Sequence, residues 1–382
     1  MSEATQQVQH DILERLGKVI DPELSKSIVD LEMIAGVDVE PASGVAPADA
    51  RPAYDVTVRV ELTVPGCPLS QTIVEQINGA IRSYAPAALT PHIAVGSMSR
   101  DKLANLVADL KAERRSNPFT KPGCKTRVFA IASGKGGVGK SSVTANLAAT
   151  FAALGYDTAV IDADIYGFSQ PGLLGAHDQP VNLNGMLMPA TAWGVKMMSI
   201  GIFAGTDKAI LWRGPRLQRS LEQFLTDVWW GDPDVLLLDL APGTGDMTIA
   251  VAQALPNAEM VVVTTPQHSA SDVAVRAGLV ALQLPVTVRG VVENMSWYEH
   301  GGERLEIFGA GGGQRVAEQL TDQLGYAVPL MARIPLIPEV REDGEQGRPA
   351  VLGADGALAD TPLAGAFKAL AEDLMAPPAG RR

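Results

Sequence analysis

The sequence predicts an α/β protein in which a small α+β domain precedes a doubly wound, mostly parallel sheet. Three observations support this. The chain has 382 residues, 46% hydrophobic and 19% charged, which suits two or three globular domains rather than a disordered chain. Residues 54–64 alternate between apolar and polar side chains, as in a half-buried strand. From residue 126 onward, short apolar runs alternate with helical segments, which is typical of strands covered on both faces.

The small α+β domain is expected over residues 1–100. Its elements, in chain order, are a helix at 6–18, strands at 33–39 and 54–64, a helix after Pro68, and a strand near 91–97. The alternation within 54–64 favours antiparallel pairing. Residues 101–125 then combine a charged helix with a connector rich in proline and glycine. We expect the domain boundary there, as a joint with few apolar residues to pin it.

The larger domain is expected over residues 126–382. Seven apolar runs predict its strands, at 127–133, 158–163, 195–200, 234–240, 259–265, 288–294 and 329–334. A helix at 141–154 follows the first strand. The last predicted helix has one apolar face, formed by Leu363, Phe367, Leu370 and Leu374. We expect this helix to pack on the domain, and we expect any ligand to bind beyond the carboxyl ends of the strands.

Charge and cysteine content exclude several classes of protein. With 31 Lys and Arg against 43 Asp and Glu, the formal net charge is −12. This argues against a nucleic-acid partner, because phosphate binding needs a basic surface. The two cysteines, Cys67 and Cys124, are too few for a disulfide framework and fit a reducing, cytoplasmic location. We see no signal peptide and no run of 18 apolar residues, so we expect no membrane partner.

A glycine-rich loop at residues 134–141 gives the strongest functional signal. Its sequence, GKGGVGKS, matches G-x-x-x-x-G-K-[ST] and lies between a predicted strand and a predicted helix. Such a loop wraps an anion with backbone N–H groups, while Lys140 reaches the β- and γ-phosphates and Ser141 ligates Mg²⁺. We therefore expect ATP and magnesium as cofactors. The predicted nucleotide-binding residues of this region are Gly134, Lys135, Gly136, Gly137, Val138, Gly139, Lys140, Ser141 and Ser142.

Acidic residues follow two of the predicted strands. Asp239 ends the apolar run LLLDL, where a carboxylate can hold Mg²⁺ directly or through water. Residues 242–245 then form a turn suited to sensing the γ-phosphate. Asp162 and Asp164 lie at the end of the strand at 158–163 and just after it, a pair suited to Mg²⁺ hydration and water activation. Helix capping by Asp164 is the structural alternative.

The second lysine of the loop, Lys135, makes the loop resemble the deviant Walker A motif of the MinD, ParA and nitrogenase iron-protein class of ATPases. In that class this lysine reaches across a dimer to the partner's nucleotide and stabilises charge on the transferred phosphoryl group. The resemblance therefore implies a homodimer in which Lys135 and Lys140 are catalytic. It also implies that Asp164 orients the attacking water and that Asp162 lies near the metal.

The same resemblance extends to the base of the nucleotide. It implies that Asn294, at the end of the strand GVVEN, hydrogen-bonds the adenine, and that residues 335–341 pack on the base. A simple turn role is the alternative for Asn294. Gln267 also follows a strand end. It fits a position on the γ-phosphate side of the site and an ordinary loop position equally well.

Longer segments resemble the narrower Mrp/ApbC family of iron–sulfur cluster carrier ATPases. They are SGKGGVGKSSVTANLA, DADIYGFSQP, WRGP, DVLLLDLAPGTGD, TTPQHSASDVAVRAG and VVENMSW. In the first 100 residues, DPEL and LTVPGCPLS resemble the small domain associated with iron–sulfur assembly. The resemblance implies an ATPase that carries a [4Fe–4S] cluster and has iron–sulfur apo-proteins or assembly factors as clients.

Residues 294–303 depart from that family. Many members carry a Cys-x-x-Cys shortly after the ENMS segment, so that two subunits supply four thiolates to one cluster. Here the segment reads NMSWYEHGGE and has no cysteine. Cys67 and Cys124 remain as candidate cluster thiols, with Cys67 at the position of a cysteine in the small-domain family. Both also fit incidental thiols, and His300 and Glu299 fit ordinary loop residues better than metal ligands.

The sequence thus favours an ATP-binding, ATP-hydrolysing iron–sulfur cluster carrier that works as a nucleotide-switched dimer. Three alternatives remain: a positioning ATPase like MinD or ParA, a Mrp-like ATPase that has lost its cluster and serves another client, and a substrate kinase or synthetase on the same fold. The last helix lacks the basic face of a membrane anchor, and the acidic net charge disfavours DNA. Both points weigh against the positioning ATPase.

Overall fold

The computed structural model describes residues 3–22, 24, 26–42, 52–63, 70–113, 116–165, 167–199 and 214–377. The chain divides into two compact units, Met1–Glu113 and Arg114–Arg382. The division falls inside the segment 101–125, at the end of its charged helix. Each unit has its own sheet and its own buried core.

The first unit is a three-stranded sheet with two helices on one face. Its elements are α1 (Glu3–Leu16), β1 (Ile34–Pro41), β2 (Ala53–Leu62), α2 (Ser70–Arg82), β3 (Ala88–Ser97) and α3 (Arg100–Glu113). The alternating valines of β2 are buried, as are the isoleucines of α2, and burial of one face explains the period-two pattern of that strand. β2 pairs antiparallel with β1 but parallel with β3, because α2 carries the chain back across the sheet between β2 and β3.

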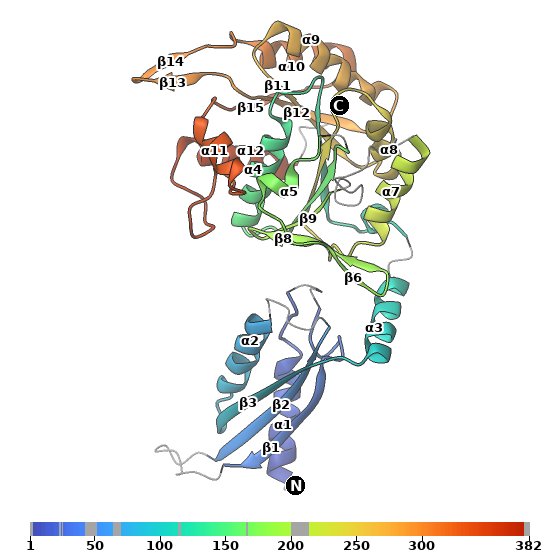
Figure 1. Ribbon diagram of the computed structural model, residues 1–382, viewed down its shortest axis with the longest axis vertical. Coiled ribbons are helices and arrows are strands. Elements are labelled where there is room, and N and C mark those ends of the chain that lie inside the picture. The colour runs from blue at the N-terminus through green and yellow to red at the C-terminus, as the bar shows by residue number, and fades with distance from the viewer. Residues whose placement is uncertain are drawn as a thin grey trace. The chain divides into compact units, whose positions relative to one another are not determined.

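The second unit contains an eight-stranded sheet in the order β15-β12-β11-β4-β10-β5-β9-β8 (Figure 1). Its strands are β4 (Arg127–Ser133), β5 (Thr158–Ala163), β8 (Ala190–Ala192), β9 (Val195–Ser199), β10 (Val235–Leu240), β11 (Glu259–Thr264), β12 (Thr287–Glu293) and β15 (Leu330–Arg333). Every pairing is parallel except that of β8, which lies antiparallel at one edge. The predicted α/β fold class is confirmed, and all seven predicted strands agree with observed ones to within one residue at each end.

Helices cover both faces of this sheet. They are α4 (Lys140–Ala153), α5 (Gln170–Leu173), α7 (Gly214–Thr226), α8 (Asp246–Ala254), α9 (His268–Gly278), α10 (Gly312–Leu324), α11 (Pro338–Glu345) and α12 (Pro362–Met375), with 3₁₀ turns η1 (Pro118–Thr120) and η2 (Leu279–Leu282). In β10, Leu236 and Leu238 face α7 and α8, whereas Val235 and Leu237 face α4 and α12. Burial on both faces explains why the strand sequences are continuously apolar.

The last helix, α12, packs against α4 as the sequence predicts. Its predicted apolar face is buried, with each of Leu363, Phe367, Leu370 and Leu374 at most 3% exposed. Thr361 caps the helix by accepting a hydrogen bond from the Ala364 N–H group.

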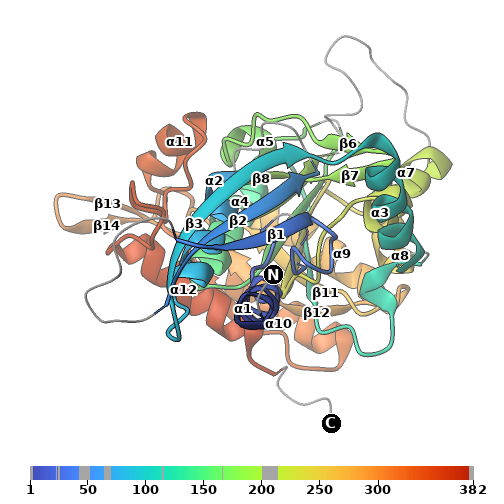
Figure 2. The ribbon, with the colours of Figure 1, turned by 90° about the horizontal axis from the view of Figure 1, so that it is seen from below.

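Two short hairpins complete the second unit. They are β6 (Val181–Leu183) with β7 (Met186–Met188), and β13 (Tyr298–His300) with β14 (Glu303–Leu305). The β13–β14 hairpin extends outward from the body of this unit in both views (Figure 1 and Figure 2). Among the described residues, no helix is long and apolar enough to cross a membrane.

Parallel pairing brings the functional segments to one edge of the sheet. The register pairs Asp239 at the end of β10 with Asp162 on β5 and with Ile131 on β4, just before the glycine-rich loop. Asn294 directly follows β12. The carboxyl ends of four strands therefore place these residues around one site, as expected for a doubly wound sheet.

Candidate nucleotide-binding site

The glycine-rich loop joins β4 to α4 and has the backbone geometry of an anion cradle. Gly137 and Gly139 have positive φ angles of 82° and 80°, which glycine adopts without strain. A side chain at Gly136 or Gly137 would meet nothing within 4 Å, so open space lies beside this backbone. Gly134 is needed for another reason, because a Cβ atom there would lie 2.3 Å from the backbone of Val273 in α9.

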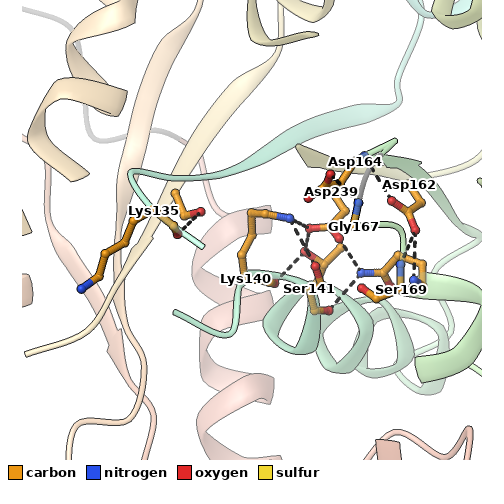
Figure 3. A network of polar contacts seen from close by, with 11 residues as sticks. Lys135, Lys140, Ser141, Asp162, Asp164, Gly167, Ser169 and Asp239 are labelled. Atoms are coloured by element: carbon orange, nitrogen blue, oxygen red, sulfur yellow. Dashed lines mark hydrogen bonds and ion pairs between the residues drawn. The ribbon is translucent and has the colours of Figure 1, made fainter. Parts of the chain in front are cut away.

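Lys140 lies at the start of α4 in a buried ion pair with Asp239 (Figure 3). The Lys140 side chain is 6% exposed and that of Asp239 is fully buried. Lys140 Nζ also lies 3.3 Å from Ser141 Oγ, and Thr144 Oγ1 donates to Asp239 Oδ1 at 3.1 Å. Lys140 thus contacts both Ser141 and Asp239, which brings together the three residues that the sequence assigns to the phosphates and Mg²⁺.

Asp162 is a second fully buried carboxylate at this edge. Its oxygens accept hydrogen bonds from the backbone N–H groups of Asp164, Ser169 and Gln170 at 2.9–3.2 Å. Burial, followed by the charge of Asp239, nevertheless raises the pKa of Asp162 from 3.8 to about 7. Asp239 is paired with Lys140, whereas the partners of Asp162 among the described residues are backbone N–H groups, so these two buried carboxylates favour a further cation.

Gln170, the first residue of α5, contacts both acids. Its side-chain Nε2 donates to Asp239 Oδ2 at 2.9 Å and to the Ser141 carbonyl at 3.0 Å, while its backbone N–H donates to Asp162 Oδ2. Gln170 lies in the segment DADIYGFSQP, but no role was predicted for it from the sequence. Thr144 and Glu293 were also missed, and an acid inside the apolar run VVEN was the signal for Glu293.

The two residues predicted to act on the γ-phosphate have partners within the chain. Lys135 points away from Lys140 (Figure 3), and its Nζ lies 3.4 Å from Gln267 Oε1 and 3.3 Å from Ser269 Oγ. Asp164 accepts a hydrogen bond from the Gly167 N–H group through Oδ1. Its second carboxylate oxygen, Oδ2, carries no such bond among the described residues. The catalytic roles of both residues remain predictions.

Asn294 lies beside the phosphate loop. Its Nδ2 donates to the Val138 carbonyl at 2.9 Å, and a Cβ atom at Gly139 would collide with the same amide. Asn294 also borders a cavity of about 620 Å³, together with Ser142, Pro335 and Ile337. The cavity thus joins the phosphate loop to the 335–341 segment, and its largely apolar lining suits a planar base.

The turn after β10 is tied to the phosphate loop. The Gly243 N–H group donates to the carbonyl of Ser133, the last residue of β4, at 2.7 Å. Residues 242–245 therefore lie next to the loop whose phosphate they are predicted to sense.

Buried Glu293 connects the base pocket to the β13–β14 hairpin. Its carboxylate accepts from Ser296 Oγ, the Gly313 N–H group and Arg333 Nε. The guanidinium of Arg333 also lies 5.5 Å from the centre of the Trp297 ring at the start of the hairpin. The nucleotide pocket and the hairpin therefore share one network of contacts.

The candidate cluster ligands do not come together in the described part of the chain. Cys124 is a free, exposed thiol, whereas Cys67 and the start of the WRGP segment lie outside the described residues. Glu299 and His300 lie exposed on β13. Within the described ranges, no three His, Cys, Asp or Glu side chains gather to hold a metal ion.

The sheet, the glycine-rich cradle and the buried Lys140–Asp239 pair define a phosphate-loop nucleotide-binding protein. Family comparison narrows this class. The chain belongs to the ParA family, described as NUBPL iron-transfer P-loop NTPases, whose model matches residues 125–375. Residues 9–88 match a second family, described as iron–sulfur cluster assembly protein. The resemblances drawn from the sequence are confirmed.

Relatives match both units of the chain. An iron–sulfur cluster carrier protein of Mycobacterium leprae is 44% identical over 362 residues, covering 94% of this chain and 90% of the relative. A protein of the same description from Bacillus subtilis is 35% identical over 333 residues, covering 86% and 88%. Among solved structures, a nucleotide-binding protein of Archaeoglobus fulgidus in complex with ADP is 31% identical, with a TM-score of 0.49 over 60% of this chain and 90% of that one.

Proposed function

We propose that the protein is an iron–sulfur cluster carrier that works as a homodimer in the cytoplasm and hydrolyses ATP with the help of magnesium. The observation that carries the proposal is the match to named carriers along both units, combined with an assembled phosphate site. Iron–sulfur apo-proteins or assembly factors would be its clients. ATP binding and hydrolysis would then shift the dimer between states that hold and release the cluster.

The residues at the strand ends fit a magnesium nucleotide. Ser141, Asp239 and Asp162 supply the oxygen atoms that Mg²⁺ prefers, and a cation beside Asp162 and Asp239 would offset the mutual repulsion that raises the pKa of Asp162. When bound, the ion neutralises charge on the β- and γ-phosphates. Lys140 and the loop N–H groups hold the same phosphates. Asn294 and the 335–341 segment hold the base.

Two further residues act on the transferred group in this proposal. Asp164 orients the attacking water, whose oxygen bonds to the γ-phosphorus as the bond to the β,γ-bridging oxygen breaks, leaving ADP and phosphate. Lys135 serves the nucleotide of the partner subunit. Its ammonium group lies next to Gln267 and Ser269 and points away from its own Lys140, which supports this assignment (Figure 3).

Replacing Lys135 with alanine tests the dimeric mechanism. We expect kcat for ATP hydrolysis to fall by about 10³-fold, as for loss of an arginine finger, while ATP affinity changes little. Exposed Lys368 on α12 offers a matched control, since Lys368→Ala removes the same charge away from the site. Loss of ATP binding in Lys135→Ala would instead place this lysine on its own subunit's nucleotide.

The cargo is tested by anaerobic reconstitution with iron and sulfide. A cluster that is retained by the wild type and lost in Cys67→Ser or Cys124→Ser would support carriage and identify a ligand. The missing Cys-x-x-Cys in residues 294–303 favours a second candidate function, in which the nucleotide switch serves another client. A wild-type protein that hydrolyses ATP and binds no iron would select this second candidate.

A further inference from the structure

The side-chain oxygen of Gln170 is an unusual feature of the nucleotide site. Gln170 is fully buried, and its Oε1 has no hydrogen-bond partner among the described residues. A buried amide oxygen without a partner costs about 1–3 kcal/mol. Such atoms are rare in folded proteins, and a missing water or ion is one of their common explanations.

The orientation of the Gln170 amide follows from its neighbours. The Ser141 carbonyl and Asp239 Oδ2 are both acceptors, so the amide nitrogen has to face them. The oxygen is therefore the atom left without a partner. In the opposite orientation, the Gln170 oxygen would face the Ser141 carbonyl and Asp239 Oδ2, which are also acceptors.

Gln170 also holds both buried acids of the site. Its side chain donates to Asp239 and its backbone N–H donates to Asp162, at 2.9 and 3.0 Å. An apolar side chain would fill the same space without an unpaired oxygen. The unpaired oxygen thus belongs to a side chain that is held against the acids of the site.

We propose that Gln170 is a positioning residue for the magnesium ion, fixing Asp239 through Nε2 and accepting a hydrogen bond from the water shell of the ion through Oε1. This inference rests on the proposed function, in which the nucleotide binds with magnesium. Mg²⁺ usually keeps several of its waters in protein sites, and those waters need acceptors. Residues that orient metal ligands typically change metal affinity by 10–100-fold when they are replaced.

The test compares ADP binding by calorimetry in excess Mg²⁺ and in EDTA. The informative quantity is the dissociation constant in EDTA divided by that in excess Mg²⁺. A general loss of structure weakens binding under both conditions and leaves this ratio unchanged. In Gln170→Met, which keeps the length and volume of the side chain, we expect this ratio to fall about tenfold relative to the wild type. Gln7→Leu is the matched control, since Gln7 Nε2 also donates to a carboxylate, Asp11, but on exposed α1.

Gln170→Glu separates metal positioning from packing. It keeps an oxygen for the ion but places a third carboxylate beside Asp162 and Asp239, so the metal-free protein should melt at a lower temperature. We nevertheless expect its ratio to equal or exceed that of the wild type. An unchanged ratio in Gln170→Met overturns the inference. A tenfold fall of the ratio in Gln170→Glu also overturns it. If Gln170→Met does not fold, the Gln170→Glu result decides the question. A wild-type ratio near one would instead refute the magnesium part of the proposed function.

Discussion

The β13–β14 hairpin begins a few residues after Asn294 of the nucleotide site, yet the two regions differ in almost every physical respect. At the nucleotide site, Asp162 and Asp239 are fully buried and receive hydrogen bonds from several elements. On the hairpin, the side chains of His300 and Glu303 are exposed, and Ile307 just beyond it is 56% exposed. The first region is fixed by many mutual contacts, whereas the second is fixed mainly at its base.

This difference indicates that the nucleotide site and the hairpin tolerate substitution differently. A changed residue in the buried site leaves a charge or a donor unpaired, so substitutions there are costly. The hairpin tip has no such partners among the described residues. We therefore expect cysteines placed at the tip to leave the phosphate site intact.

Restoring cysteines to the hairpin gives the largest expected change. His300 and Glu303 are register partners across the turn, and Gly301 and Gly302 have the positive φ angles of a two-residue type I′ turn. In a chain carrying Cys67→Ser and Cys124→Ser, we expect His300→Cys with Glu303→Cys to create a thiol pair on each subunit. After anaerobic reconstitution, about four iron atoms per dimer should bind, as in one [4Fe–4S] cluster with four thiolates.

The matched control replaces the same two hairpin residues with serine, which should bind no iron in that background. Both variants should hydrolyse ATP at the rate of the parent chain. Iron binding that abolishes ATP hydrolysis would show that the two regions are not separable.

Breaking the Lys140–Asp239 pair should have the next largest effect. Lys140→Met leaves the Asp239 carboxylate buried without its cation, and we expect the free energy of unfolding of the second unit to fall by about 3–5 kcal/mol. Urea unfolding followed by tryptophan fluorescence measures it, because all five tryptophans lie beyond residue 126. Adding Asp239→Asn should restore part of the loss. A Lys140→Met variant that is as stable as the wild type would contradict this account.

The pH dependence of stability should show a smaller effect from Asp162. Because its pKa rises from 3.8 to about 7 on folding, the folded state keeps a proton that the unfolded state releases. The contribution of Asp162 to the free energy of unfolding should therefore decrease between about pH 4 and pH 7, by up to about 1.4 kcal/mol per pH unit, and level off above. The difference in free energy of unfolding between the wild type and Asp162→Asn, measured by urea unfolding at a series of pH values, isolates this slope. Saturating Mg²⁺ and ADP should abolish it, and a rising difference would refute the assignment.

The sequence was most informative where one local pattern decided the structure. The inner parallel strands β4, β5 and β10 are apolar runs buried on both faces, so their lengths could be read from the residues alone. The phosphate loop, Asp239 and Asn294 lie at strand ends, and parallel pairing then brought them together. Strands of three residues, such as β8 and those of the two hairpins, are too short to show a period.

The contacts that the sequence did not reveal depend on tertiary structure. Gln170 finds Asp239 only because α5 starts beside the end of β10, and no spacing in the chain encodes that approach. The parallel pairing of β2 with β3 likewise depends on the crossover through α2, whereas alternation describes only the burial of each face. Cys67 lies outside the described residues, so its role remains a prediction.

The packing of α12 on α4 also has a consequence for how the protein is made. Chains leave the ribosome from the N-terminus, so the phosphate loop and α4 emerge long before α12 does. Until then the face of α4 that later meets Phe367 and Leu370 has no cover, and the helix beginning at Lys140 lacks its support. A nascent or truncated chain would therefore lack one of the two layers that hold the helix after the phosphate loop, the other being the sheet.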